Sequence, residues 1–406
     1  MAKYNYDKKA LKGLGVGAFL GEVKVREAKI AEASEDMPVS VFNSNILASK
    51  LHPHVQFVKV SAVKEHKDAK SFVLTADKSK GTETLAYFRA GQYISVGLMI
   101  NGAMICKPYT LQSGPGDALG EDRSYCITVK HSNGGFASEY ILENWKEGTE
   151  LAISGPLGDF YYQGLRDAKS VVALAGGSGI TPFYSMASAI ADGIEDFDLT
   201  ILYGSRTADN ILLGDELAGV AARSNGRVKV VNVLSDEEKE GYEHGLLTAE
   251  LVKKYAPSGD YSLFVCGPKA MYPFIKGEVA KLGLSPRRAR FELSGEFGDP
   301  SKDPKYPKEA AGKEFSVKVL IRGEEKTVKC RSEQSLLQAM EAGGISVPSD
   351  CRSGKCGWCH SRLISGEVFI PEDNDGRREA DKKFGWVHPC STYALSDIEI
   401  EIFPIM

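Results

Sequence analysis

Four cysteines near the C-terminal end constrain this chain more than any other feature. Cys351, Cys356 and Cys359 have the spacing C-x4-C-x2-C, and 30 residues separate Cys359 from Cys390. This spacing is typical of a [2Fe–2S] cluster held by four thiolates. A structural zinc site is the alternative, but zinc motifs usually pair two C-x2-C units and this stretch has one. We therefore predict a [2Fe–2S] cluster with these four cysteines as its metal ligands.

Length and charge narrow the class of protein. The chain has 406 residues, which is enough for two to three domains. Its net charge of −4 argues against a nucleic-acid binder, which would carry a strongly basic surface. No apolar run approaches the roughly 20 residues of a membrane-spanning helix, and the N-terminus does not resemble a signal peptide. We expect a cytoplasmic protein that is not integral to a membrane.

The cysteines lie in a small C-terminal module. Prolines and charges between residues 295 and 315 have the composition of a linker, which we place at residues 299–312. After it, we expect a hairpin turning at Gly323–Glu325, a helix with Ser332 as its N-cap, and a closing strand at residues 396–403. The pattern predicts an α+β, β-grasp-like domain over residues 313–406.

Two different patterns precede the linker. Residues 54–160 hold short strand-like runs with turns between them, which favours an antiparallel β-barrel. Residues 161–298 alternate apolar strands with helical stretches, which favours an α/β domain with a parallel sheet. Residues 1–53 form an N-terminal extension whose weak pattern gives it no role. The fold class is therefore multi-domain.

Two motifs in the barrel region suit a flavin. Lys107-Pro108-Tyr109-Thr110 ends a strand, and a flat aromatic ring followed by a hydroxyl can cover and hydrogen-bond an isoalloxazine ring. Gly134 and Gly135 precede Ser138 and a predicted helix, whose N-terminal N–H groups can bind a pyrophosphate. Each motif alone could be an ordinary strand or turn, but their order before a nucleotide fold favours cofactor binding.

Two further motifs suit a pyridine nucleotide. The segment GGSGITP, residues 176–182, follows a strand and opens a helix, so its N–H groups can bind phosphate. It is not G-x-G-x-x-G, so the ordinary Rossmann fingerprint is absent. Cys266-Gly267-Pro268 ends a later strand, at the edge where open α/β sheets bind ligands.

Together, these motifs resemble the ferredoxin–NADP reductase superfamily over residues 54–298, and CRSGKCGWC resembles plant-type ferredoxins over residues 313–406. The resemblance implies an FAD-binding barrel, an NAD(P)-binding domain and a [2Fe–2S] domain, as in the reductase components that feed oxygenases. It implies catalytic roles for Tyr109, Thr110, Cys266 and Glu292. It also implies cofactor contacts by Lys107, Pro108, Tyr109, Thr110, Val129, Lys130, Gly134, Gly135, Ser138, Gly177, Ser178, Gly179, Thr181, Ser205, Arg206, Cys266, Gly267 and Pro268.

Several points stay open in the sequence. The family usually has arginine where this chain has Lys107, which cannot make a planar two-point contact. The Gly-Gly-x-x-Ser element favours FAD over FMN. Ser205 and Arg206 could hold the 2′-phosphate of NADPH, whereas Asp209 opposes that reading, so NADH and NADPH remain equal candidates.

The order of the modules predicts an electron path from NAD(P)H through FAD and the cluster to a separate acceptor protein, such as an oxygenase or a demethylase. The cluster loop is basic, and we expect the acceptor to dock near it; the cations are Arg352, Lys355, Arg362, Arg377, Arg378, Lys382 and Lys383. Trp358 should be partly exposed. The alternatives are a stand-alone NAD(P)H oxidase or a quinone or metal-ion reductase, and a [2Fe–2S] redox sensor.

Overall fold

The computed structural model describes residues 16–32, 43–120, 122–132, 136–292 and 298–403. The chain divides into two units, residues 1–50 and residues 51–406. The first unit contains helix α1 (Val16–Glu32) and most of helix α2 (Asn43–Leu51), which buries none of its side chains. Among the helices of the described part, none is both long enough and apolar enough to cross a bilayer.

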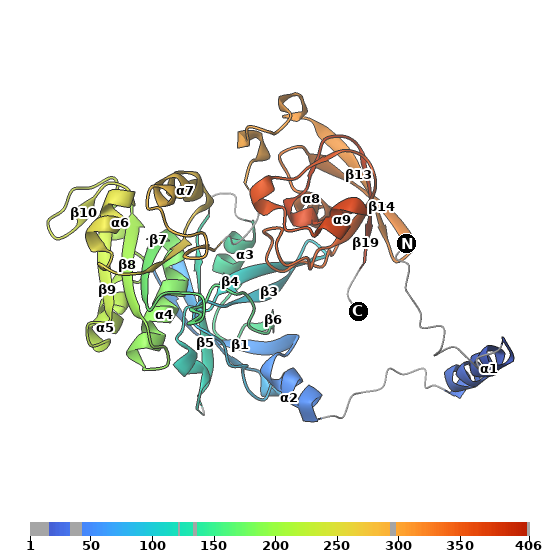
Figure 1. Cartoon of the computed structure of the whole chain (residues 1–406), viewed down its shortest axis with the longest axis horizontal. Helices are drawn as coiled ribbons and strands as arrows, with labels where there is room; N and C mark the ends of the chain where they lie inside the picture. Colours follow the sequence, from blue (N-terminus) through green and yellow to red (C-terminus); the bar gives the residue numbers. More distant parts are fainter. Residues whose placement is uncertain (1–15, 33–42, 121, 133–135, 293–297, 404–406) are drawn as a thin grey trace. The chain divides into compact units, whose positions relative to one another are not determined.

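The second unit begins with a six-stranded antiparallel sheet in the order β4-β3-β6-β1-β2-β5 (Figure 1). Its strands are β1 (Val55–Glu65), β2 (Ala69–Ala76), β3 (Tyr93–Ile100), β4 (Ala103–Thr110), β5 (Ser124–Lys130) and β6 (Glu150–Ser154). The chain after β4 closes the sheet toward its other edge, because Gln112 N–H donates to the carbonyl of Cys126 in β5 at 2.7 Å. The predicted antiparallel barrel is confirmed, and helix α3 (Phe136–Asn144) follows β5.

A parallel sheet follows in the order β10-β9-β8-β7-β11-β12. Its strands are β7 (Ser170–Gly176), β8 (Asp198–Ser205), β9 (Val228–Leu234), β10 (Glu243–His244), β11 (Ser262–Cys266) and β12 (Ala289–Phe291). Helices α4 (Thr181–Ala191), α5 (Gly214–Arg223), α6 (Ala249–Tyr255) and α7 (Tyr272–Ala280) cover it.

Alternate residues of each central strand pack into two separate hydrophobic cores, one on each face of the sheet, because successive side chains point to opposite faces. In β7, Ala173 and Ala175 pack with the core that includes α4 and α5, whereas Val172 and Leu174 pack with the core that includes α6 and α7. Because both faces are buried, the strand reads as the continuous apolar run VVALA. The predicted parallel sheet with covering helices is confirmed.

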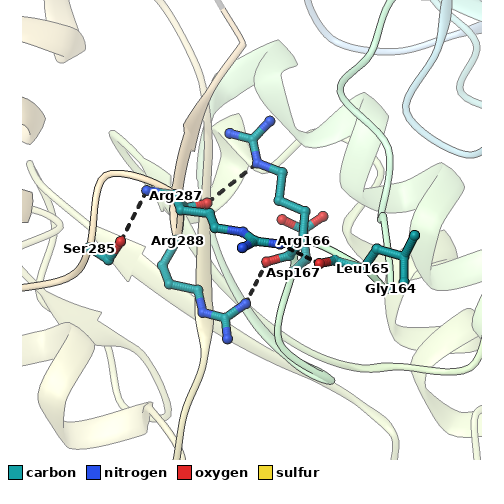
Figure 2. A pocket seen from close by; sticks show the side chains of 7 residues that line it. All are labelled: Gly164, Leu165, Arg166, Asp167, Ser285, Arg287 and Arg288. Carbon is teal, nitrogen blue, oxygen red and sulfur yellow. Dashed lines mark hydrogen bonds between the residues drawn. The ribbon is translucent and has the colours of Figure 1, made fainter.

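Three arginines tie the connection between the two sheets to the segment that leads into β12 (Figure 2). Arg166 donates through Nε to the carbonyl of Arg287 at 3.4 Å, and Arg288 donates back to the carbonyl of Arg166 at 2.5 Å. Arg287 in turn donates to the carbonyl of Leu165. Beneath them, Arg290 pairs with the buried Asp167 at 3.0 Å. These contacts fix the place where the barrel and the parallel sheet meet.

The C-terminal module is a five-stranded sheet in the order β14-β13-β19-β15-β17, with a two-stranded ribbon β16-β18. Its elements are β13 (Glu314–Ile321), β14 (Glu324–Arg331), α8 (Leu336–Ala342), β15 (Ser361–Ser365), β16 (Val368–Phe369), α9 (Glu379–Lys383), β17 (Trp386–Val387), β18 (Tyr393–Ala394) and β19 (Ile398–Ile402). The hairpin β13–β14 lies beside the parallel pair β13–β19, and α8 packs into the same core. This confirms the predicted α+β, β-grasp-like domain.

Two local predictions in this module are wrong. The hairpin turns at Arg322 and Gly323, with φ of 52° and 82°, rather than at Gly323–Glu325. Two consecutive positive φ values match the twist of the flanking strands, which explains the two-residue turn. The cap of α8 is Ser335, not Ser332, because Ser335 and Gln338 form a reciprocal capping box.

The segment interpreted as a linker packs onto the C-terminal module where it is described. Tyr306 is buried, donates its hydroxyl to the carbonyl of Ser332 at 3.2 Å, and meets the ring of Phe369 edge-on at 5.2 Å. Pro300 and Ala310 are also buried. Proline and charge content predicted an open linker, but Tyr306 gives this segment an apolar anchor.

Candidate electron-transfer site

The four predicted cluster ligands come together as two pairs of thiols. Cys359 and Cys390 lie with their sulfurs 3.4 Å apart, and Cys351 hydrogen-bonds to Cys356. Among the residues that the structure describes, no three such side chains converge on one point as they would around a single ion. In a [2Fe–2S] cluster each iron takes two protein ligands, so two thiol pairs suit that cluster.

Backbone N–H groups of the loop point at these sulfurs. Gly354 N–H lies 3.2 Å from Cys390 Sγ, and Cys356 N–H lies 3.3 Å from Cys351 Sγ. The contacts with Cys356 and with backbone N–H groups lower the pKa of Cys351 to about 4. A loop that supplies N–H donors to the sulfurs fits an iron–sulfur cluster, whose potential depends on such hydrogen bonds.

Gly354 has to be glycine in this loop. Its φ is 81°, and an added Cβ would lie 2.0 Å from the carbonyl oxygen of Asn374. Gly357 also has a positive φ, 74°, but a Cβ there would meet nothing closer than 3.6 Å. The loop therefore depends on two left-handed glycines, of which one also fills a space with no room for a side chain.

Arg352 was predicted to belong to the basic docking surface, and this prediction is wrong because Arg352 is buried. Its side chain is 1% exposed and makes two 2.6 Å hydrogen bonds with Glu341 in α8. It also donates to the carbonyl of Cys106 in β4 at 3.1 Å. Arg352 therefore lies inside the contact between the cluster loop and the barrel, and it cannot take part in a surface. Trp358 is 46% exposed, as expected.

The predicted flavin motif lies on β4, directly after the residue that Arg352 contacts. Lys107, Pro108, Tyr109 and Thr110 pair across β3 with Val96, Ser95, Ile94 and Tyr93. Burial raises the pKa of the Tyr109 hydroxyl, so this ring is neutral and mostly covered. An aromatic ring followed by a hydroxyl at the end of a barrel strand suits a flavin ring.

Val129 and Lys130 end β5, on the other side of the seam that closes the barrel. Lys130 pairs with Asp68 at 3.0 Å, and its Nζ lies 3.9 Å from the position that a Cβ on Gly177 would take. The end of β5 thus meets the glycine loop of the parallel sheet. Ser138 lies in α3, whereas Gly134 and Gly135 lie outside the described residues.

The predicted nucleotide loop packs on the Cys266 motif. Gly177, Ser178 and Gly179 form a short 3₁₀ turn between β7 and α4, and Thr181 is the first residue of α4. A Cβ on Gly179 would lie 2.2 Å from the carbonyl of Cys266. The structure therefore brings together the two motifs that the sequence separates by some 85 residues, and it explains why the loop needs glycine.

Cys266 and Glu292 are joined through Tyr272. Tyr272 donates its hydroxyl to the carbonyl of Glu292, and Gly267 N–H points at the same hydroxyl at 3.4 Å. Glu292 N–H donates to the carbonyl of Val265 at 2.9 Å. Burial raises the pKa of Cys266 well above its usual value, so its thiol is neutral, and burial raises the pKa of Glu292 to about 7.

Tyr93 is a residue that the sequence reading missed. It pairs with Thr110, and its ring lies 2.9 Å from the position that a Cβ on Gly158 would take. Burial raises the pKa of its hydroxyl, and the negative charges of Asp350, Cys351, Cys356 and Glu292 act in the same direction. Tyr93 therefore lies beside Thr110 of the predicted flavin motif, a position that no spacing pattern could reveal.

Ser205 ends β8, and Arg206 follows it. The Arg206 guanidinium is 81% exposed and pairs with Asp236 at 2.7 Å. Glu237 accepts from the backbone of Ala208 at 2.7 Å, so carboxylates surround the cation that could have held a 2′-phosphate.

Family models match three successive parts of the chain. They are an oxidoreductase FAD-binding domain over residues 58–162, an oxidoreductase NAD-binding domain over residues 173–277 and a 2Fe–2S iron–sulfur cluster binding domain over residues 319–395. The fold and these matches define a flavin and iron–sulfur oxidoreductase that uses FAD, a [2Fe–2S] cluster and NADH or NADPH. The chain therefore contains an FAD-binding, an NAD-binding and a 2Fe–2S domain, in the order that the resemblance to the ferredoxin–NADP reductase superfamily implies.

Relatives that match most of this chain include reductase components of oxygenases. The glycine betaine monooxygenase reductase subunit of Chromohalobacter salexigens is 28% identical, over 86% of this chain and 95% of its own length. The ferredoxin reductase component of 3-ketosteroid-9-alpha-monooxygenase from Mycobacterium tuberculosis is 29% identical, over 72% and 78%. The solved structure of phthalate dioxygenase reductase shares the fold, with a TM-score of 0.59, 24% identity, and coverage of 86% of this chain and 98% of that one.

Proposed function

We propose that this chain passes electrons from NAD(P)H to a separate oxygenase or demethylase protein, which docks on the cluster domain. The observation that carries the proposal is the bond from Arg352 to the carbonyl of Cys106. It holds the cluster loop against the strand that leads into Lys107–Thr110, so one polypeptide joins the flavin residues to the thiols. A cytoplasmic location remains a prediction of the sequence.

The individual site assignments are part of this proposal. Gly177, Ser178, Gly179 and Thr181 would bind the nucleotide diphosphate through the N-terminal N–H groups of α4. The Cys266–Pro268 turn, packed against Gly179, would support the nicotinamide. Tyr109 and Thr110 would contact the flavin ring, with Lys130 and Ser138 near its diphosphate. Glu292 would close the flavin site from the end of β12.

Bound FAD would accept two electrons as a hydride, and the cluster would carry one electron at a time. The side chains then need only to position these groups and to exclude water. The neutral Cys266 thiol offers an apolar surface rather than a nucleophile. The N–H groups of Gly354 and Cys356 would stabilise negative charge on the sulfurs.

An anaerobic titration of the purified protein with NADH and, separately, NADPH tests the proposal. Flavin and cluster absorbance should both fall, and the cluster should need the flavin to be reduced first. Cys351→Ser should remove the cluster signal and leave flavin reduction intact. A protein without bound flavin, or a cluster spectrum unchanged by Cys351→Ser, would refute the proposed path.

Turnover without a partner separates the alternatives. A carrier should turn over slowly with oxygen or a quinone alone and rapidly once a protein acceptor is added. Fast turnover with a quinone alone would favour a stand-alone reductase. Slow flavin-to-cluster transfer would favour a redox sensor.

A further inference from the structure

An exposed group of apolar side chains covers one edge of the cluster domain. Ile364 is 45% exposed, Phe384 is 64% exposed and Phe403 is 46% exposed. Phe403 lies beside Trp386, with the two ring centroids 5.4 Å apart. We refer to Ile364, Phe384, Trp386 and Phe403 as the aromatic patch.

Strand register places two members of the patch on the outer face of the sheet. Arg362 pairs with Trp386 across β15 and β17, and Leu363 N–H donates to the carbonyl of Gly385 at 2.8 Å. Since alternate residues of a strand point to opposite faces, Ile364 and Trp386 point away from the face that buries Ser361 and Val387. Phe384, the C-cap residue of α9, precedes Gly385 and lies next to this pairing in the chain.

The aromatic patch is connected to a cluster ligand. His360 directly follows Cys359, and its ring stacks on Trp386 with the centroids 4.2 Å apart and an interplanar angle of 8°. Asp381 holds the His360 ring through Nε2 at 3.1 Å. An unbroken series of bonds and ring contacts therefore runs from Cys359 through His360 and Trp386 to the surface.

The two thiol pairs lie in different surroundings. Cys351 precedes Arg352, which donates at 3.1 Å to the carbonyl of Cys106, directly before the predicted flavin residues of β4. Cys359 continues instead into the His360–Trp386 stack. Electrons would therefore enter near the first pair and leave near the second.

Cations lie along the exposed rim of the aromatic patch, together with some carboxylates. Lys383 Nζ lies 5.7 Å from the centroid of the Phe384 ring, and the Arg378 side chain is 80% exposed. Of the two carboxylates between them, Asp381 pairs with Arg378 and has a side chain that is 7% exposed, whereas the Glu379 side chain is 90% exposed. Glu379 is exposed and pairs with Lys382, and Glu401 lies opposite Arg362 on β19.

We propose that the aromatic patch is the surface on which an acidic redox protein docks to receive electrons from the cluster. An apolar centre with a cationic rim suits a partner that has exposed carboxylates around an apolar contact. The proposal rests on the proposed electron-transfer function, because it locates the exit of that path.

Stopped-flow oxidation of the NADH-reduced holoprotein tests the surface. The acceptors are soluble cytochrome b5, as an acidic haem protein, and ferricyanide, as a small ion that needs no docking surface. The variants are Phe384→Ser and Lys383→Glu. The matched control is Leu246→Ser, which changes a similarly exposed apolar residue, 56% exposed, in the nucleotide domain.

Each patch variant should transfer electrons to cytochrome b5 about tenfold more slowly, and high salt should slow the wild-type protein. Oxidation by ferricyanide, the cluster spectrum and cluster reduction by NADH should stay unchanged. The control should behave as wild type.

The proposed docking surface is refuted if the wild-type protein transfers no electrons to cytochrome b5, or if this transfer is independent of salt. It is also refuted if both patch variants transfer electrons as fast as wild type. In those cases the proposed function still stands as long as NADH reduces the cluster. A wild-type cluster that NADH does not reduce refutes the proposed function itself.

Discussion

Arg352 and Glu341 form a buried ion pair with two hydrogen bonds of 2.6 Å, and both side chains are less than 7% exposed. Glu341 belongs to α8 of the C-terminal module, whereas Arg352 follows the predicted ligand Cys351 and also reaches the carbonyl of Cys106. The backbone of Arg352 is left-handed, with φ of 54°. The pair therefore fixes both the shape of the cluster loop and its position against the barrel.

Replacing Arg352 should damage stability and internal electron transfer together. Arg352→Leu leaves the Glu341 carboxylate buried without its partner, which should lower the free energy of unfolding by about 3–5 kcal/mol. Where the variant still holds its cluster, transfer from flavin to cluster should slow, because the loop loses its bond to β4. Urea denaturation and rapid-freeze EPR measure the two effects.

The exposed pair between Lys329 and Glu314 provides the control, since its side chains are 68% and 53% exposed. Lys329→Leu should change the free energy of unfolding by less than about 1 kcal/mol. If Arg352→Leu changes the free energy of unfolding as little as Lys329→Leu does, the buried pair does not hold the loop in place.

The sequence predicts which residues carry the chemistry of the site better than it predicts which residues meet in the fold. Cysteine spacing and the glycine loops act locally, so Cys351 and Gly179 could be recognised from their neighbours. Arg352 was placed on the surface because a charge beside other charges usually lies in solvent, and only the fold reveals Glu341 beside it. Tyr93 carries no motif, and only the fold places it beside Thr110 and Gly158.

Gly354→Ala should abolish stable cluster binding. The new Cβ would collide with the carbonyl of Asn374, and the loop would have to move the N–H that points at Cys390. Iron and sulfide content and visible absorbance of the purified variant measure the loss.

Gly357→Ala separates backbone strain from crowding. Both glycines have a positive φ, so both alanine variants lose roughly 1 kcal/mol from left-handed backbone, but only Gly354 lacks space. Gly357→Ala should keep most of its cluster. Equal loss of the cluster in both variants would show that the positive φ alone, and not the lack of space at Gly354, causes the loss.

The acidic surroundings of Arg206 should make the enzyme prefer NADH. Asp236 pairs with the Arg206 guanidinium, and Glu237 adds a second negative charge at the neighbouring Ala208. Asp236→Ser should free Arg206 and raise kcat/KM for NADPH about tenfold, with little change for NADH. Asp198→Ser, which disturbs the exposed pair with Arg227, should alter neither. A wild-type preference for NADPH contradicts this reading.

Glu292 should make stability depend on pH between about 4.5 and 7. Burial raises its pKa from 4.5 to about 7, so in this window the folded protein keeps a proton that the unfolded chain releases. Stability therefore falls as the pH rises through the window, by at most roughly 3 kcal/mol, and changes no further above it. Glu292→Gln cannot titrate and should lose this part of the pH dependence.

Urea midpoints of Glu292→Gln and wild type are measured from pH 4.5 to 8. The two midpoints should converge at the acidic end and separate toward pH 7, where the variant should be more stable. Glu147→Gln, which changes an exposed residue, should follow wild type at every pH. Parallel profiles for Glu292→Gln and wild type would mean that the carboxyl of Glu292 is ionised in the folded protein across the whole range.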